Sequence, residues 1–252
     1  MFDRAYAFAF SPTGTSYKVA RAVLEGLGGG AMEDVTSQAA PQSFAPGQLV
    51  VFAVPVFGGR VPAVALERLA ALQGNGAFAA ALVVYGNRAY EDALLELKIA
   101  LEQAGFVVAG AAAFVAQHSI VPTLAAGRPN TDDLAQAAAF GRGLAEKLAA
   151  APTPAPLAVP GNTPYKVFGG SSFRPYATER CTRCGACAGA CPVGAIPADA
   201  PNETLAERCI TCMHCVAVCP HKARQLPQAP LEALAARLAP LCQSPKQPEL
   251  LL

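Results

Sequence analysis

Eight of the nine cysteines fall into two copies of one spacing near the C-terminus, C-x2-C-x2-C-x3-C-P. The first copy consists of Cys181, Cys184, Cys187, Cys191 and Pro192, and the second of Cys209, Cys212, Cys215, Cys219 and Pro220. Three closely spaced thiolates suit three corners of an iron–sulfur cubane, and the fourth cysteine of such a motif reaches the neighbouring cluster. The spacing therefore predicts two [4Fe–4S] clusters.

This crossing assigns the ligands of both clusters. We expect the first cluster to be held by Cys181, Cys184, Cys187 and the distant Cys219. We expect the second to be held by Cys209, Cys212, Cys215 and Cys191. The ninth cysteine, Cys242, lies outside both motifs in an apolar stretch and is interpreted as a bystander thiol.

Three other interpretations of the cysteines fit less well. Zinc favours thiolates in separated pairs, which a tight triplet ending in C-P does not offer. Disulfides require an oxidising compartment, and bridges within one motif would constrain almost nothing. A plain cysteine-rich core conflicts with the charged flanks Glu179, Arg180, Arg183 and Glu207. The two copies resemble bacterial two-cluster ferredoxins over about 60 residues.

The chain of 252 residues is too long for a cluster domain alone and suggests a medium and a small domain. A segment with five prolines among fourteen residues, 151–164, is typical of an extended and semi-stiff linker. We therefore expect a first domain over 1–150, the linker over 151–164, a cluster domain over 165–228 and a C-terminal helix and tail over 229–252. Hydrophobic residues make up 53% of the chain, enough for a sizeable core in the longer domain.

Apolar runs alternate with helical spacing before the linker. The pattern predicts strands over 4–10, 31–35, 49–54, 78–85 and 107–115, and helices over 17–27, 63–72, 90–104 and 131–149. Thr131 is the expected cap of the last helix, with Asp132 and Asp133 complementing its dipole. Such alternation indicates an α/β fold, a doubly wound parallel sheet covered on both faces.

The loops after the strands of such a sheet form its ligand site. The first strand is followed by Ser11, Pro12, Thr13, Gly14, Thr15 and Ser16 and then by a helix. Hydroxyl groups and free backbone N–H groups at a helix N-terminus suit a phosphate, although a simple N-cap turn would look similar. The third and fourth strands end in P-V-F-G-G-R-V-P (55–62) and Y-G-N-R-A-Y (85–90), which offer aromatic faces and close backbone amides to a flat ring.

These three loops resemble those of flavodoxins, and the resemblance covers about residues 2–149. It implies a five-stranded sheet of order 2-1-3-4-5 and a bound FMN, whose phosphate would contact Ser11, Thr13, Gly14, Thr15 and Ser16. The ring would lie against Pro55, Val56, Phe57, Gly58, Gly59, Tyr85, Gly86, Asn87, Arg88 and Tyr90. By the resemblance, Phe57 or Tyr90 would stack on the ring, with Tyr85 as an alternative, and Gly58 would lie near the flavin N5.

The whole chain is similar to the flavodoxin–ferredoxin fusion proteins of anaerobic bacteria, a small α+β two-cluster domain following the flavodoxin-like one. The segments 55–62 and 85–94, and His118-Ser119 after the fifth strand, carry this resemblance. His118 is a candidate contact of the flavin, and a loop histidine bonded to backbone is the alternative. His214, inside the second cysteine triplet, could tune a cluster by its charge. His221, Lys222 and Arg224 are interpreted as a solvated turn.

The predicted function is transfer of low-potential electrons between the clusters and FMN, as a carrier or relay for partner oxidoreductases. The alternatives are an FMN-dependent reductase of the quinone or flavin type, a redox sensor or dedicated reductant of one partner, and a domain that keeps the fold without FMN. A net charge of +1 gives no sign of nucleic-acid binding, and no apolar run is long enough for a membrane span. Cluster thiolates and the lack of a signal peptide favour a cytoplasmic location.

Overall fold

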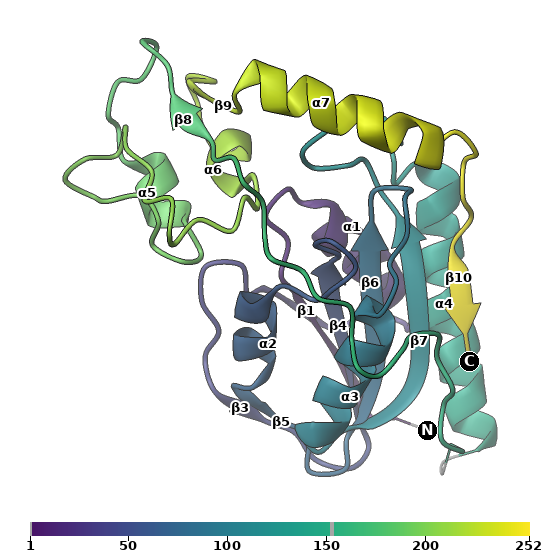
Figure 1. Cartoon of the computed structure of the whole chain (residues 1–252). Coiled ribbons are helices and arrows are strands. Elements are labelled where there is room, and N and C mark those ends of the chain that lie inside the picture. Colours follow the sequence, from purple (N-terminus) through teal and green to yellow (C-terminus); the bar gives the residue numbers. More distant parts are fainter. Residues whose placement is uncertain (1, 152–153) are drawn as a thin grey trace.

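The computed structural model describes residues 2–151 and 154–252 and places a six-stranded sheet at the centre of the first domain (Figure 1). The strands, in spatial order, are β2 (Ala31–Asp34), β1 (Arg4–Ala9), β4 (Gln48–Pro55), β6 (Phe78–Tyr85), β7 (Val107–Val115) and β10 (Glu249–Leu251). The first five are parallel and follow the predicted order 2-1-3-4-5, which is confirmed.

The sheet forms because its central strands are almost entirely apolar and bury both faces. β4 and β6 are continuous runs of Val, Ala, Leu and Phe, and their inner residues are fully buried. Near-continuous apolar strands are typical of a parallel sheet that is covered by helices on both faces. The predicted α/β fold class is confirmed in this part of the chain.

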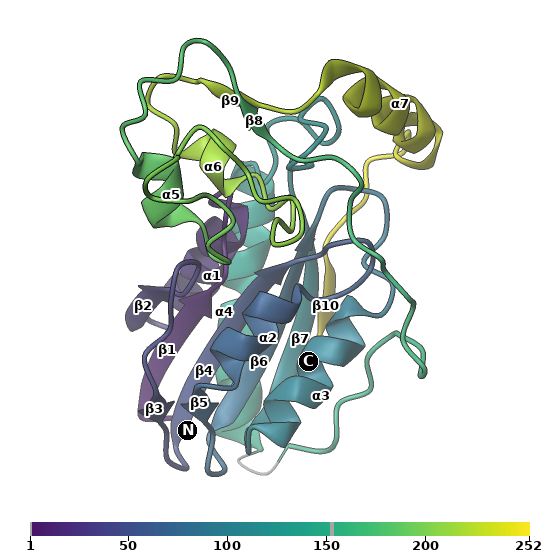
Figure 2. The ribbon, with the colours of Figure 1, turned by 60° about the vertical axis from the view of Figure 1, so that its left-hand side comes forward.

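Two pairs of helices cover the sheet, one pair on each face (Figure 2). One face packs against α1 (Thr15–Gly26) and α4 (Thr131–Ala150), and the other against α2 (Ala63–Leu69) and α3 (Ala93–Gln103). A small parallel pair, β3 (Gln42–Ser43) and β5 (Leu72–Gln73), lies beside the sheet, so the helix predicted over 63–72 ends early.

The cap of the last helix of the domain lies one residue before the predicted one. Asn130, not Thr131, caps α4, since its side chain accepts from the backbone N–H of Asp133 while the Asp133 carboxylate accepts from the N–H of Asn130. Asparagine followed three residues later by an acid satisfies two free donors at once. The expectation for Thr131 was therefore wrong.

The proline-rich linker lies against the first domain as a strap along α3. Leu157 and Val159 pack on its core, and Gly161 lies against Leu95. The Asp92 carboxylate accepts from the backbone N–H groups of Asn162 and Lys166, at 2.8 and 2.6 Å. Residues 152 and 153 of the predicted linker lie outside the described residues.

The cysteine-rich part forms a small lobe at the carboxyl ends of the parallel strands (Figure 2). It consists of the antiparallel pair β8 (Tyr176–Ala177) and β9 (Arg224–Gln225) and of two short helices, α5 (Ala186–Ala190) and α6 (His214–Ala217). Each short helix follows a left-handed residue, at Gly185 and Met213, so the two cysteine motifs adopt related turns.

The C-terminal segment returns to the first domain instead of ending as a tail. After α7 (Gln228–Leu238) and the 3-10 turn η1 (Ala239–Leu241), β10 pairs antiparallel with β7, aligning Leu250 with Ala112. It covers the free edge that a fifth strand would otherwise expose, a common way to protect a sheet. Among the described residues, no helix combines the length and apolarity needed to cross a membrane.

Candidate functional site

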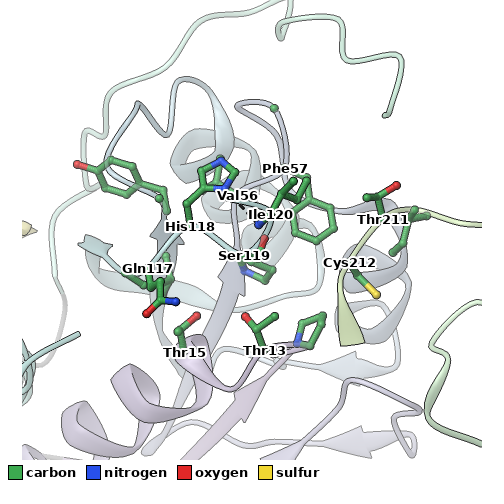
Figure 3. Close-up of a pocket in the computed structure, with 18 of the residues that line it drawn as sticks. Thr13, Thr15, Val56, Phe57, Gln117, His118, Ser119, Ile120, Thr211 and Cys212 are labelled. Carbon is green, nitrogen blue, oxygen red and sulfur yellow. Dashed lines mark hydrogen bonds between the residues drawn. The ribbon is translucent and has the colours of Figure 1, made fainter. Parts of the chain in front are cut away.

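A pocket opens at the carboxyl ends of β1, β4, β6 and β7, beneath the cysteine-rich lobe (Figure 3). It encloses about 730 Å³ of empty space, counting the part open to solvent. Four loops of the first domain line it, and a fifth wall comes from the cysteine-rich lobe through Ile210, Thr211 and Cys212. The pocket therefore lies between the two parts of the chain.

The loop after β1 forms the floor of the pocket. Gly14 adopts a left-handed conformation, φ 82°, at the start of α1, where a side chain would be strained. The Ser11 hydroxyl accepts from the backbone N–H of Tyr17 at 2.9 Å, and the Ser11 N–H donates to the Thr36 hydroxyl at 2.7 Å. These bonds fix the turn so that Thr13 and Thr15 face the pocket (Figure 3).

The same loop passes a test of fit for a phosphate group. The Ser16 hydroxyl is buried, with its residue 1% exposed, and has no hydrogen-bond partner among the described residues. A buried hydroxyl without a partner is costly, and a phosphate oxygen at the N-terminus of α1 would satisfy it. Thr13 and Thr15 line the pocket and add hydroxyl donors, whereas Ser11, Gly14 and Ser16 lie behind them and do not line it.

The loop after β4 forms one wall. Pro55, Val56, Phe57 and Gly58 line the pocket, and Phe57 exchanges two backbone hydrogen bonds with Arg60, at 2.9 and 3.1 Å, which close the turn. Gly58 has φ 60°, and a Cβ there would lie 2.2 Å from the ring of Phe168. Gly58 is thus held under an aromatic ring that comes from beyond the linker.

The loop after β6 contributes less than the sequence predicted. Tyr85 and Gly86 line the pocket, and burial raises the pKa of Tyr85 to about 12, so its hydroxyl stays protonated. Gly59, Asn87, Arg88 and Tyr90 do not line it.

These four residues have structural roles instead. The Asn87 side chain donates to the carbonyls of Cys242 and Ser244, and the Tyr90 hydroxyl donates to Glu249 at 2.5 Å. The Gly59 carbonyl accepts from Asp92 N–H, and Arg88 pairs with Glu91. The returning C-terminal segment therefore engages the Asn87 and Tyr90 side chains, whereas Gly59 and Arg88 are held by the residues at 91 and 92.

His118 lies at the pocket as expected, next to Gln117, Ser119 and Ile120 (Figure 3). Its Nδ1 accepts from the backbone N–H groups of Ile120 and Val121, at 3.2 and 3.1 Å. Burial lowers the pKa of His118, so the ring is neutral and its Nε2 carries the proton. The structure thus shows the backbone-bonded histidine, and its place at the pocket leaves contact with a flavin as a prediction.

The cysteines gather around two further hollows in the lobe. One is lined by Cys181, Cys184, Cys187 and Cys219, and the other by Cys191, Cys209, Cys212 and Cys215. Each hollow combines one triplet with the fourth cysteine of the other motif. Among the described residues, no group of His, Cys, Asp and Glu converges on the position of a single metal ion.

The thiols of the second hollow are the more deeply enclosed. Burial raises the pKa of Cys212 and of Cys215 to about 12. Burial also acts to raise the pKa of Cys219, but backbone N–H groups of Ala223, His221 and Arg224 outweigh it and lower that pKa. A group that binds thiolates must therefore supply the charge stabilisation that the buried thiols lack.

Several pocket residues escaped the sequence analysis. Phe168, Ser171, Ile210 and Thr211 line the pocket but belong to the second part of the chain. Only the way the two parts pack brings them there, and no local pattern signals that packing. Cys212 was expected as a cluster ligand but not as a wall of the flavin pocket.

Comparison with known proteins covers both parts of the chain. Residues 176–220 match the family of 4Fe-4S dicluster domains. The chain joins a flavodoxin-like domain to a 4Fe–4S dicluster domain. This combination fits the predicted flavodoxin–ferredoxin fusion, and the match to 4Fe-4S dicluster domains supports an electron-transfer role with iron–sulfur clusters.

Solved structures similar to the flavodoxin-like domain include two flavodoxins, each over 58% of this chain. One is a flavodoxin from the domain Archaea (14% identity, TM-score 0.40, 99% of that chain) and the other is from Streptococcus pneumoniae TIGR4 (18%, 0.39, 97%). Rubredoxin oxygen:oxidoreductase of Desulfovibrio gigas matches at 14% identity with a TM-score of 0.37. This chain spans 35% of its length. No curated protein matches the chain. The strand order, rather than these low scores, identifies the fold.

Proposed function

We propose that this protein is an internal electron relay that holds one FMN and two [4Fe–4S] clusters and serves redox partner proteins. FMN exchanges one or two electrons and the clusters exchange one each, so joining them links single to paired electron transfer. The residues that would hold FMN are the hydroxyl loop 11–16, the turn 55–58, Tyr85, Gly86 and His118. The eight cysteines would hold the clusters in the crossed sets described above.

The observation that carries the proposal is the position of Cys212. Its side chain lines both the flavin pocket and the second cysteine hollow. A cluster bound by Cys212 would therefore be separated from a flavin in the pocket by little more than this side chain (Figure 3). Thr211 and Ile210 beside it form part of the same wall.

The first cysteine set faces outward. Cys184 is exposed and Cys181 partly so, whereas Cys212 and Cys215 are buried. This supports an order in which the first cluster meets outside partners and the second lies between it and the flavin. The linker strap on Asp92 holds the chain to the first domain just before it enters the lobe.

The hydrogen-bonded groups of the flavin pocket suit a neutral site. His118 is uncharged, the loop 11–16 contains no Lys or Arg, and Tyr85 is protonated. The phosphate would be held by hydroxyl and backbone donors at the N-terminus of α1. His118 Nε2 carries the proton and offers a donor at the pocket, because its Nδ1 is occupied by backbone donors.

Anaerobic purification with iron, sulfide and flavin measured per chain tests the proposal. We expect about eight irons and about one FMN, and partial reduction should move electrons from clusters to flavin or the reverse. Eight irons without FMN would reduce the protein to a ferredoxin carried on a flavodoxin-shaped domain. Iron well below this number in cluster-reconstituted protein would contradict the cluster assignment.

A second candidate function, an FMN-dependent reductase of an organic acceptor, has one observation in its favour. A larger cavity, about 1250 Å³ counting open space, adjoins the flavin pocket and shares Phe57, Phe168, Ser171 and Ile210 with it. Its walls are mainly apolar, as a quinone would require. Quinone turnover that disappears when Val64, which lines this cavity and not the first pocket, is replaced by tryptophan while internal transfer persists would favour the reductase.

A further inference from the structure

Arg224, at the start of β9, is buried although it follows the last cysteine motif in a charged turn. Its residue is 3% exposed, whereas His221 and Lys222 beside it are exposed. The expectation of a solvated turn was therefore wrong for Arg224. The antiparallel pairing of Arg224 with Ala177 and the bond from Thr178 N–H to the Ala223 carbonyl pull this part of the chain inward.

The buried guanidinium has neutral partners only. It donates to the Thr204 hydroxyl at 2.6 Å and to the carbonyls of Pro201 and Glu203, at 2.5 and 2.8 Å. None of the ion pairs of the described residues includes Arg224, and its Nε has no hydrogen-bond partner among them. A buried cation without an anion is strongly unfavourable, so its counter-charge must come from another source.

The source of this negative charge lies beside the Arg224 guanidinium. Arg224 lines the hollow of Cys181, Cys184, Cys187 and Cys219. A cubane with four thiolate ligands carries net negative charge, and that charge becomes larger on reduction.

We propose that Arg224 is the internal counter-charge of the first cluster and raises its reduction potential. This inference rests on the proposed function and deepens it. A fixed positive charge in a water-poor site stabilises the reduced cluster more than the oxidised one. The unpartnered Nε is the donor that remains for the cluster or its thiolates.

The test is a redox titration of the full-length, cluster-loaded protein, monitored by EPR, for wild type and Arg224→Gln. Gln removes the charge while retaining hydrogen-bonding capacity. We expect the first cluster's reduced-to-oxidised ratio at a fixed ambient potential to fall about tenfold, a shift of ~59 mV to more negative potential for one electron. The second cluster should shift in the same direction by less.

Two further variants separate charge from structure. Arg224→Lys keeps the charge and should retain most of the wild-type potential. Arg183→Gln is the matched control, since Arg183 lines the same hollow but is exposed, and water screens its charge. We expect its shift to be no more than a third of that in Arg224→Gln.

The outcomes are distinct. Unchanged potentials in fully loaded Arg224→Gln, or equal shifts in Arg224→Gln and Arg183→Gln, would overturn the inference. If Arg224→Gln fails to bind iron, Arg224→Lys provides the test. A cluster-loaded Lys variant whose reduced-to-oxidised ratio falls about tenfold at the same ambient potential would show that the charge is not the cause. Wild-type protein without cluster signals would contradict the proposed function itself, whatever the variants do.

Discussion

His214 donates from Nδ1 to the carbonyl oxygen of Pro12, 2.5 Å away. A carbonyl oxygen can only accept, so this bond fixes the proton on Nδ1. Pro12 belongs to the loop that faces the flavin pocket, and His214 opens the short helix that carries Cys215. The backbone N–H of His214 also donates to Cys212. One residue therefore connects the second cysteine motif with the flavin pocket.

Replacement of His214 by alanine should weaken the docking of the lobe on the pocket without removing a cluster ligand. A net hydrogen bond of ~1 kcal/mol changes the ratio of docked to undocked lobe about fivefold. We expect iron content to be unchanged and flavin reduction through the clusters to slow by up to about fivefold in stopped-flow experiments. His221→Ala, at an exposed position in the same lobe, should leave that rate unaltered.

Ser16→Ala tests the phosphate site. Because the Ser16 hydroxyl has no partner within the described protein, its removal should leave the unfolding free energy of the apoprotein unchanged or slightly higher. Loss of a hydrogen bond to a charged phosphate should raise the Kd for FMN about tenfold or more. Fluorescence titration of the apoprotein with FMN measures this.

Ser11→Ala is the matched control for that variant. The Ser11 hydroxyl caps α1 through Tyr17 N–H, so its loss should destabilise the fold by ~1 kcal/mol. If the Ser16→Ala protein loses as much stability as the Ser11→Ala protein and keeps its affinity for FMN, the Ser16 hydroxyl has a structural role and does not bind phosphate.

The sequence allowed the parallel sheet and the hydroxyl loop to be predicted because both depend on local patterns. Continuous apolar strands such as β6 signal their own burial, and Gly14 marks a turn that few other residues can adopt. β10 was not predicted, since three residues at the C-terminus carry too weak a signal to distinguish an edge strand from a tail.

The pocket wall was predicted only on the flavodoxin-like side, because Phe168 and Cys212 reach it through packing of distant segments. Tyr90 resembled a ring contact by its place in the loop, but Glu249 of the returning segment bonds its hydroxyl. Arg224 was misplaced for the same reason, since its burial depends on pairing with β8. The predictions from the sequence failed mainly at contacts between residues that are far apart in the sequence.

Cys191→Ser and Cys219→Ser test the crossed cluster assignment. Cys191 shares a hollow with the second triplet, so its loss should damage the cluster next to the flavin and interrupt flavin reduction while the outer cluster remains. Cys219→Ser should damage the outer cluster, leaving chemical reduction of the second cluster and of the flavin possible. EPR of each variant, with flavin absorbance, gives the comparison. Uncrossed ligation predicts the reverse pattern.

Asp92→Asn should loosen the linker strap. Backbone hydrogen bonds from Lys166 and Asn162, with the Asn162 side chain and the nearby Arg60 charge, hold the pKa of Asp92 below its ordinary value despite burial. These bonds therefore stabilise the folded protein fully at pH values above the ordinary pKa of an aspartate. The stabilisation is lost as the pH falls through the lowered pKa of Asp92. A hydrogen bond to a charged group contributes ~1.5–3 kcal/mol.

We expect limited proteolysis of segment 154–166 to accelerate in Asp92→Asn at neutral pH. In the wild-type protein the same acceleration should occur only in acid, below the ordinary Asp range. Asp132→Asn, a substitution at an exposed acid on α4, serves as the control and should behave as wild type. A linker equally resistant in both variants at neutral pH would show that the strap does not depend on Asp92.

Flash photoreduction of the fully loaded protein, followed at several protein concentrations, tests the relay most directly. If electrons pass from the second cluster to FMN through the wall formed by Cys212, flavin reduction after cluster reduction will be first order, with a rate constant independent of protein concentration. A rate proportional to protein concentration, or reduced clusters beside a flavin that stays oxidised, would contradict an internal relay.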